Sequence, residues 1–275
     1  MFKILAKKQL NAAVTSLTLD APLIARKVQP GQFVIVRIDE HGERIPLTVS
    51  DFDAQCGTVT IVVQAIGAST KRLVALDEGD SVLDVVGPLG LPTEFGTPKK
   101  AIIIGGGVGC AIAYPQAKAL YNMGVQTTVI AGFRSKDIVI LEEEMKAVSN
   151  KLYITTDDGS YGKQGFVTDV LKELLSEDQY DLVIAIGPVP MMKFVSLTTK
   201  EFGVKTIVSL NPIMIDGTGM CGGCRVSVGG KVKFACVDGP DFDGHQVDFD
   251  ELMRRNSFYR EEEAHSCRMG VEHNG

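Results

Sequence analysis

The sequence lacks several features that would place the protein in a particular class. It contains no uncharged apolar run of 18 residues, so no transmembrane helix is expected. The first residues, MFKILAKKQL, have neither the apolar core nor the cleavage site of a signal peptide. No basic tract is present and the net charge is −6, which argues against nucleic acid as a partner. We therefore expect a cytoplasmic protein that has neither a membrane nor a nucleic acid as its partner.

Cysteine is scarce, with six residues in a chain of 275, and its distribution is uneven. Three of the six stand in one window of 16 residues, namely Cys221, Cys224 and Cys236. This clustering is typical of a metal site in a reducing compartment and not of a disulfide framework. Cys56 and Cys110 stand alone and are expected to serve as small apolar residues.

The cysteine window has a ferredoxin-like spacing. Asp216 stands five positions before Cys221, and Cys in its place would create the C-x4-C-x2-C…C pattern of plant-type [2Fe–2S] ferredoxins. Thiolates suit iron–sulfur clusters, and a carboxylate can supply one hard oxygen ligand. Glycines in the same stretch permit the unusual backbone angles of a loop wrapped around a cluster; they are Gly217, Gly219, Gly222 and Gly223. We therefore predict a [2Fe–2S] cluster held by Asp216, Cys221, Cys224 and Cys236.

Two alternatives to this cluster assignment stay open. Zinc usually takes four Cys or His ligands in two pairs, and no second pair follows this one. Asp216 could instead cap the loop, with Cys267 or a water molecule completing the site. Cys267 lies 31 residues beyond Cys236 in a charged tail, so we favour the carboxylate as the fourth ligand.

Residues 1–98 have the pattern of a small antiparallel β-barrel domain. Short segments that alternate or are β-branched are separated by turn residues, which is typical of such barrels. The expected strands cover residues 2–9, 13–20, 32–39, 44–50, 57–65 and 80–86. A short helix is expected over residues 69–76, because Ser69 and Thr70 can cap it.

Two stretches of this domain could bind a flavin. The first runs from Arg44 to Ser50, where an Arg beside a strand that offers hydroxyl groups can hold a pyrophosphate and bond a ring edge. The second runs from Gly67 to Thr70, a small-residue turn at a helix N-terminus, which is a phosphate site. Either stretch alone has an ordinary structural explanation. Their joint occurrence favours FAD, since both suit its pyrophosphate.

Between residues 99 and 210 apolar strands and helices alternate, which predicts a doubly wound parallel sheet with helices on both faces. The expected strands cover residues 100–104, 125–131, 151–156, 180–186 and 204–210, and the expected helices 108–123, 140–149, 166–176 and 190–202. Ligands of such sheets bind beyond the carboxyl ends of the strands. Glycine recurs at four of those ends, and packing alone is a poor explanation for the repetition.

The first glycine run, Gly105 to Gly109, is not the usual dinucleotide fingerprint. G-x-G-x-x-G would need glycine where Cys110 stands, and the next strand end offers Arg134 but no acid for a ribose. A nicotinamide nucleotide is therefore expected through another version of the site. Arg134 and Lys136 could hold the 2′-phosphate of NADP, so the choice between NAD and NADP stays open.

Residues 211–275 form the cluster module and a tail. After Cys236 comes an acidic loop whose acids do not keep EF-hand spacing, so calcium is not expected. His245 in this loop is expected to be solvated. A short helix is expected from Asp250 to Tyr259.

These patterns together resemble a known family. A barrel with R-x-P-L-T, an α/β domain with GGGVG and G-P-x-P-M, and a D-x4-C-x2-C-x11-C module stand in this order. The order resembles the ferredoxin–NADP reductase superfamily, and within it the electron-transfer subunits of the dihydroorotate dehydrogenase B type. It resembles still more the small subunits of NADH-dependent reduced ferredoxin:NADP oxidoreductases (the sulfide dehydrogenase subunit type). The resemblance extends to about Tyr259, but the dihydroorotate subunits carry Cys at the position of Asp216.

The resemblance implies roles for individual residues. The FAD phosphates would be bound by Arg44, Gly67, Ser69 and Thr70, and the flavin ring would be flanked by Pro46, Leu47 and Thr48, with Thr48 near its reactive edge. The nicotinamide nucleotide would be bound by Gly105, Gly106, Gly107, Val108, Gly109, Arg134, Asp158, Gly187, Pro188 and Met191. Many members of the superfamily have Cys directly before the Gly-Pro pair, where this chain has Ile186.

The resemblance also implies the activity of an NAD(H)-dependent oxidoreductase subunit. A hydride would pass between nicotinamide and FAD, and single electrons between FAD and the cluster, with no catalytic acid or base from the protein. The implied partner is a larger flavin and iron–sulfur subunit of a bifurcating complex, through which ferredoxin is reached indirectly. Two alternatives remain: an electron-transfer subunit of dihydroorotate dehydrogenase B, against which Asp216 argues, and a redox sensor that binds cofactors without turnover.

Overall fold

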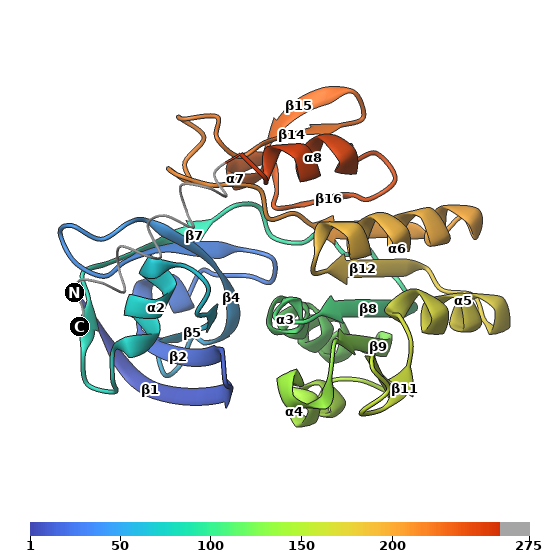
Figure 1. Cartoon of the computed structure of the whole chain (residues 1–275), viewed down its shortest axis with the longest axis horizontal. Coiled ribbons are helices and arrows are strands. Elements are labelled where there is room, and N and C mark those ends of the chain that lie inside the picture. The colour runs from blue at the N-terminus through green and yellow to red at the C-terminus, as the bar shows by residue number, and fades with distance from the viewer. Residues whose placement is uncertain (259–275) are drawn as a thin grey trace.

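The structure, a computed structural model, describes residues 1–258. Its strands form two seven-stranded sheets and one two-stranded hairpin. Figure 1 shows the first sheet curled into a barrel, the second sheet flanked by helices, and the hairpin at the top of the view. No helix of this described part is long and apolar enough to cross a membrane.

The first sheet is antiparallel and has the order β6-β1-β2-β5-β4-β3-β7. Its elements are β1 (Phe2–Asn11), β2 (Val14–Asp20), α1 (Pro22–Ala25), β3 (Phe33–Arg37), β4 (Ile45–Asp53), β5 (Thr58–Gln64), α2 (Ala68–Ala75), β6 (Ser81–Val82) and β7 (Asp84–Leu89). Along β5 the apolar residues Val59, Ile61 and Val63 are buried while their neighbours are half-buried, as expected of a strand with one face on a core. The predicted antiparallel barrel is confirmed.

The strand predicted at residues 80–86 is in fact two strands with different neighbours. β6 pairs with β1 at one end of the sheet, and β7 pairs with β3 at the other end. Only Leu83 separates β6 from β7, so the two edge strands of the sheet lie close together and the sheet nearly closes into a barrel. Pairing partners of this kind cannot be read from a residue pattern. Cys56 was also assigned wrongly, because it is exposed in the turn between β4 and β5.

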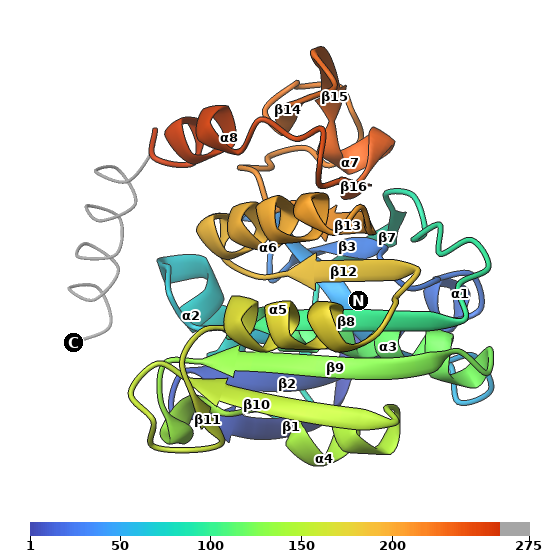
Figure 2. The same ribbon diagram turned by 90° about the vertical axis from the view of Figure 1, so that its right-hand side faces the viewer.

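The second sheet has the order β11-β10-β9-β8-β12-β13-β16, and its first six strands are parallel. These are β8 (Lys100–Gly106), β9 (Gln126–Phe133), β10 (Lys151–Thr156), β11 (Lys163–Gln164), β12 (Leu182–Ile186) and β13 (Lys205–Ser209). The helices are α3 (Gly109–Asn122), η1 (Lys136–Ile138), α4 (Glu142–Ala147), α5 (Val167–Glu177) and α6 (Val189–Glu201). Figure 2 shows α5 and α6 on one face of the sheet, with α3 and α4 on the other. The predicted doubly wound parallel sheet is confirmed.

The C-terminal module contains β14 (Arg225–Val228), β15 (Lys231–Phe234), α7 (Ala235–Asp238), β16 (Asp241–Asp243) and α8 (Phe249–Arg255). β16 pairs antiparallel with β13 and so extends the nucleotide-domain sheet, where an acidic loop was expected. His245 is half-buried and its Nε2 lies 3.0 Å from Thr199 Oγ1, so the expectation of a solvated side chain was wrong. The expected helix from Asp250 ends at Arg255, and Tyr259 lies outside the described residues.

One apolar core joins all three parts of the chain. It includes Phe33 and Ile35 from the barrel, Val208 from the parallel sheet, and Cys224 and Cys236 from the C-terminal module. The domain boundaries predicted at residues 98–99 and 210–211 fall between β7 and β8 and after β13. They remain predictions, since this core extends across both of them.

A buried carboxyl group lies where the three parts meet. Asp241 Oδ2 accepts hydrogen bonds from Thr93 Oγ1 at 2.5 Å and from Gln116 Nε2 at 3.4 Å. Asp241 Oδ1 and Gln116 Oε1 are buried acceptors that have no hydrogen-bond partner among the described residues. Desolvation raises the pKa of Asp241 above its ordinary value of 3.8, and the nearby donors oppose that shift only in part.

We predict that Asp241→Asn gains stability relative to the wild type as the pH rises. Because the folded-state pKa of Asp241 is raised, its contribution to stability is fully present below pH 3.8 and is lost as the pH rises through the folded value. The amide does not titrate, so the difference in melting temperature should move in favour of the variant between about pH 4 and pH 8. The exposed neighbour Asp243 supplies the control, Asp243→Asn. A melting-temperature difference that stays constant over this interval would contradict the burial of an ionisable group here.

Candidate functional site

The two stretches predicted to bind a flavin lie next to each other. Arg44 directly precedes β4. Within β4 the half-buried residues Pro46, Leu47 and Thr48 pair with Ile35, Val34 and Phe33 of β3, respectively. Gly67 is the N-cap of α2, and the first turn of this helix contains Ser69 and Thr70. The Ser69 hydroxyl donates to the carboxylate of Glu43, the residue before Arg44. The barrel therefore brings a guanidinium group and a helix N-terminus to one place, which suits a pyrophosphate.

In the first turn of α2, the Thr70 hydroxyl is bonded to its own backbone, whereas the Ser69 hydroxyl is bonded to Glu43. Thr70 Oγ1 accepts hydrogen bonds from the N–H groups of Ile66 and Gly67, at 3.1 and 3.0 Å, so it holds its own turn together. Among residues 1–258, no atom lies within 4 Å of a Cβ built at Gly67, so this turn is open on that side. The open turn and the helix N–H groups fit a phosphate better than the Thr70 hydroxyl does.

The glycines after β8 and β12 are explained largely by close packing of two turns. A Cβ at Gly106 would lie 2.5 Å from Met191 Sδ, and one at Gly109 would lie 2.4 Å from the Ile186 carbonyl oxygen. A Cβ at Gly187 would lie 2.8 Å from Met191 Cε. Packing thus accounts for these positions, contrary to the expectation drawn from their repetition.

Gly107 is different from its neighbours and is the position that a ligand could approach. Its φ is +56°, and a Cβ there would meet nothing within 4 Å in the part of the chain that the structure describes. Its N–H donates to the Gly132 carbonyl at 2.8 Å, which ties the first glycine turn to the end of β9. Val108 follows as the N-cap of α3, and Pro188 is the N-cap of α6. Two helix N-termini therefore flank an open glycine at the carboxyl edge of the sheet.

Arg134 and Asp158 follow neighbouring strands and meet at the same edge. The Asp158 N–H donates to the Arg134 carbonyl at 3.2 Å. Asp158 Oδ1 accepts from the Ser160 hydroxyl at 2.6 Å and from the Ser160 N–H at 2.9 Å, and these bonds lower the pKa of Asp158. Arg134 is exposed. A carboxylate anchored by Ser160 and an exposed guanidinium at one sheet edge are suited to the ribose end of a nucleotide.

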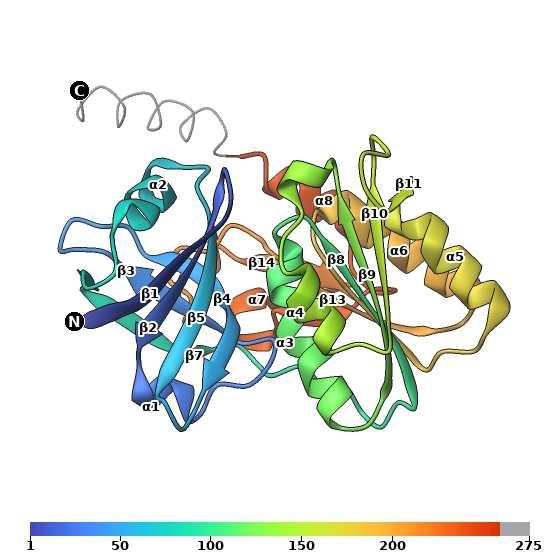
Figure 3. The same ribbon diagram turned by 90° about the horizontal axis from the view of Figure 1, so that it is seen from below.

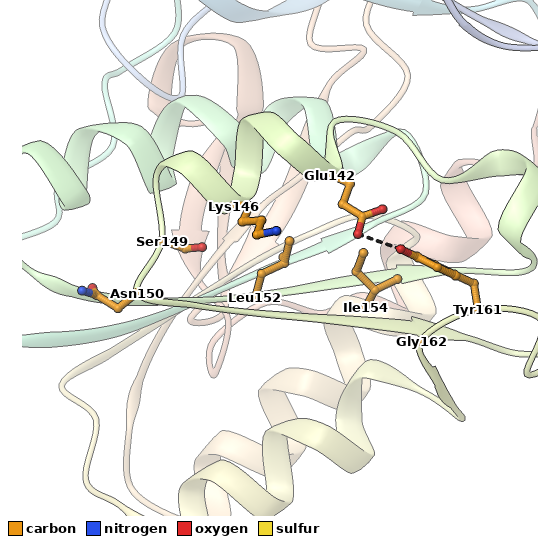
Figure 4. Close-up of a pocket in the computed structure, with 8 residues that line it drawn as sticks. All are labelled: Glu142, Lys146, Ser149, Asn150, Leu152, Ile154, Tyr161 and Gly162. Carbon is orange, nitrogen blue, oxygen red and sulfur yellow. Dashed lines mark hydrogen bonds between the residues drawn. The ribbon is translucent and has the colours of Figure 1, made fainter.

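Sequence reasoning missed a groove beside this edge, shown in Figure 4. Its volume is about 510 Å³, and it is lined by Glu142, Lys146, Ser149, Asn150, Leu152, Ile154, Tyr161 and Gly162. The Tyr161 hydroxyl donates to Glu142 Oε1 at 2.9 Å, and Lys136 Nζ lies 5.3 Å from the centre of the Tyr161 ring. The tyrosine shortly after Asp158 was the signal available in the sequence. The groove thus lies between α4 and β10, with Tyr161 and Gly162 at one end.

The four predicted cluster ligands are brought together only in part. Cys224 and Cys236 are buried with their sulfur atoms 3.2 Å apart, because the β14–β15 hairpin pairs Arg225 with Phe234. Within residues 1–258 no three His, Cys, Asp or Glu side chains are close enough to hold one metal ion. Cys221 and Asp216 lie on the exposed loop before the hairpin. The alternative ligand Cys267 lies outside the described residues.

The pKa values of Cys236 and Cys221 shift in opposite directions. Burial and the neighbouring Cys224 thiol raise the pKa of Cys236 to about 12. Cys221 Sγ accepts the Gly223 N–H at 3.4 Å, and this hydrogen bond lowers the pKa of Cys221. Two thiols in contact and a third already bonded to a loop N–H form a soft donor set that fits an iron–sulfur cluster.

Asp216 has the contacts of a loop cap, and these leave room for a ligand role. Its Oδ2 accepts the Thr218 N–H at 2.9 Å and also the Thr218 hydroxyl, and both bonds lower the pKa of Asp216. Neither of these two bonds ends on Oδ1, so they leave that oxygen for an iron ligand. The cap and the ligand interpretations are therefore compatible.

The cluster loop rests directly on the barrel. Arg44 Nη2 donates to the Asp216 carbonyl at 3.1 Å. A Cβ at Gly217 would lie 3.0 Å from Ile35 Cδ1, so only glycine, here with a φ of +83°, allows the loop to approach this closely. The predicted flavin and cluster sites therefore share Arg44 as a contact.

Comparisons with known proteins match each part of the chain. Residues 103–197 match the oxidoreductase NAD-binding domain family, and residues 211–248 match the iron–sulfur cluster binding domain of dihydroorotate dehydrogenase B. An uncharacterised protein in the adh 3′ region of Clostridium beijerinckii is 53% identical over 96% of this chain and 92% of its own length. A homologue of the dihydroorotate dehydrogenase B electron-transfer subunit from Thermotoga maritima is 48% identical, over 95% of this chain and 92% of its own.

A solved structure is similar over nearly the whole length. It is a chain from the NADH-dependent reduced ferredoxin-NADP oxidoreductase, studied for flavin-based electron bifurcation. The two chains are 46% identical, the match covers 98% of each, and the TM-score is 0.93.

We predict that Arg44→Ala weakens FAD binding while the cluster absorbance is retained, because the loop keeps the bonds of Asp216 to Thr218 and the packing of Gly217 on Ile35. A charge-assisted hydrogen bond to a phosphate contributes about 1.5–3 kcal/mol, so the flavin should bind roughly tenfold or more weakly. The measurement is the ratio of FAD to protein after desalting. Arg72→Ala is the matched control, because Arg72 lies on α2 and pairs with Asp39 at 2.5 Å. Release of FMN on denaturation, or full FAD occupancy in Arg44→Ala, would show the assignment to be wrong.

We predict that Asp216→Cys keeps the cluster but shifts its potential and EPR signal, since ligand type tunes both. Cys267→Ser should change neither property. The measurements are EPR spectroscopy and a redox titration of each reconstituted variant. The assignment fails if Asp216→Ala leaves spectrum and potential untouched while Cys267→Ser destroys the cluster.

Proposed function

Because this chain belongs to the family of electron-transfer subunits of the dihydroorotate dehydrogenase B type, we propose that it is the small subunit of a bifurcating NADH-dependent reduced ferredoxin:NADP oxidoreductase. The observation that carries the proposal is the 46% identity to a chain of that complex over 98% of both chains. This match includes the barrel, the parallel sheet and the cluster loop. The activity is oxidation or reduction of NAD(H) coupled to single-electron transfer.

The residues divide the work among three adjacent sites. Arg44 and the N-terminus of α2 hold the FAD pyrophosphate, while Pro46, Leu47 and Thr48 position the ring. The glycine turns and Arg134 hold the nicotinamide nucleotide, and Asp216, Cys221, Cys224 and Cys236 hold the cluster. When bound, these groups supply hydride transfer at the flavin and one-electron transfer at the cluster. The chain contributes binding, orientation and exclusion of water.

The partner is a larger flavin and iron–sulfur subunit that handles NADP(H) and ferredoxin. Support comes from the name of the relatives, which are electron-transfer subunits, and from the complex to which the chain is similar. The exposed cluster loop, with Met220 89% exposed, is the part of the site that faces outward. Native purification of the complex followed by cofactor analysis tests this assembly directly.

A second candidate is an electron-transfer subunit of dihydroorotate dehydrogenase B. It is favoured by 36% identity to that subunit from Fusobacterium nucleatum over 80% of this chain. Asp216 argues against it, since Cys is expected there in the dihydroorotate subunits. Dihydroorotate-dependent reduction of the purified complex separates the two candidates, and NADH oxidation with an artificial acceptor separates both from a sensor.

We predict that NADH reduces the bound flavin much faster than NADPH does. Asp158 is an exposed carboxylate at the sheet edge that also carries Arg134, and hydrogen bonds from Ser160 lower its pKa. Its negative charge opposes a 2′-phosphate at that edge. Stopped-flow reduction with each donor at equal concentration is the measurement. Asp158→Asn should bring the rate of flavin reduction by NADPH closer to the rate with NADH. A clear preference for NADPH in the wild type would instead give Arg134 a phosphate-binding role.

A further inference from the structure

A proline inside α3 leaves one backbone carbonyl without its helical donor. In an α-helix the carbonyl of residue 111 accepts from the N–H of residue 115, and that position is Pro115, which has no N–H. Ala111 is 1% exposed, so water does not satisfy the carbonyl. A buried carbonyl without a donor is costly, and a donor from elsewhere in the chain is required.

The missing donor comes from the barrel. Ser50 Oγ donates to the Ala111 carbonyl at 2.7 Å, and Ser50 is only 4% exposed. Ser50 lies on β4, 61 positions from Ala111, so the bond links the barrel to the parallel-sheet domain. Figure 3 shows α3 between the barrel and the sheet.

Ser50 occupies an irregular position in its strand. Between β4 and β5 the partners are Val49 with Ile61 and then Asp51 with Thr60, so Ser50 is an extra residue in the ladder. Such bulges redirect a side chain and often occur beside functional sites. The bulge thus aims the hydroxyl of Ser50 at α3.

Both ends of this hydrogen bond lie close to the proposed cofactor sites. Ser50 comes two residues after Thr48, which the proposed function places at the reactive edge of the flavin. Ala111 comes two residues after Gly109, where the first glycine turn enters α3. A fixed distance between these two elements sets the distance between flavin and nicotinamide.

We infer that Ser50 is a positioning residue, which holds the first turn of α3 against β4 through the carbonyl that Pro115 frees. This inference rests on the proposed function, since hydride transfer depends on the spacing that Ser50 sets. A shift of about 1 Å in a reacting pair can cost a hundredfold in rate.

Ser50→Ala should therefore slow reduction of the flavin by NADH by on the order of tenfold to a hundredfold. FAD content and the affinity for NADH should change little, because Ser50 contacts neither proposed binding turn. Ser50→Thr retains the hydroxyl and should recover much of the rate. Stopped-flow reduction gives the limiting rate and the apparent Kd separately.

The matched control uses the adjacent residue on the same two elements. Asp51 Oδ1 accepts from Lys118 Nζ at 2.7 Å, and both side chains are more than a third exposed. Surface ion pairs of this kind contribute little. Asp51→Asn should therefore leave the rate close to that of the wild type.

A second substitution tests whether Ser50 positions α3 or only supplies a hydrogen-bond donor to the Ala111 carbonyl. Pro115→Ala restores an N–H that can bond the Ala111 carbonyl within the helix. In the Ser50→Ala background it should recover the melting temperature but not the reduction rate. Recovery of both together would show that Ser50 only satisfies a buried carbonyl, and the inference would be overturned.

Hydrogen exchange provides a readout that needs no turnover. Amides from Cys110 to Ala113, at the start of α3, should exchange faster in Ser50→Ala than in Asp51→Asn, and unchanged exchange in Ser50→Ala would overturn the inference. A wild-type rate in Ser50→Ala would overturn it as well, while leaving the proposed function intact. If NADH fails to reduce the wild-type flavin, the proposed function fails, and the exchange experiment still decides whether Ser50 fixes α3.

Discussion

Burial of one shared apolar core is the constraint on which the arrangement of the three parts depends. Phe33 and Ile35 of the barrel, Val208 of the parallel sheet and Cys236 of the C-terminal module all contribute to it. Each large apolar side chain that is fully buried contributes about 1.5–3 kcal/mol. Because these contacts involve all three parts, the cofactor sites are held by the same packing that stabilises the fold. The buried thiols of the cluster site are themselves members of this core.

Much of the fold was predictable because its elements follow local patterns. Continuous apolar strands such as β8 and the regular alternation with helices indicated a parallel sheet, and the spacing of Asp216, Cys221 and Cys224 indicated a cluster loop. β16 was not predictable, since Asp241 and Asp243 look like loop residues until Phe242 is seen packed in the shared core. The glycine turns were recognised but misinterpreted in part, because the close approach of Met191 to Gly106 is a tertiary contact.

For the sites as well, the residue types were visible in the sequence, whereas the contacts between distant residues were not. The flavin stretch around Arg44 and the α2 turn were predicted from residue types, and the fold brings them into contact through Glu43 and Ser69. No residue pattern could have placed Arg44 on the Asp216 carbonyl, a contact between positions 172 apart in the chain. The Arg44 guanidinium lies at the barrel and also contacts the cluster loop, so its positive charge acts on both predicted sites.

The pairing of β16 with β13 also determines how the chain can be divided. β13 would otherwise be the last strand of the parallel sheet, with the backbone groups of Ile207, Val208 and Ser209 on that edge open to any other extended chain. β16 covers this edge, and it belongs to the same segment that carries Cys236. A fragment truncated after Leu210 would lose the predicted cluster ligands and would also expose a β-strand edge that promotes aggregation. The C-terminal module thus protects the edge of the nucleotide-domain sheet from aggregation, in addition to its part in electron transfer.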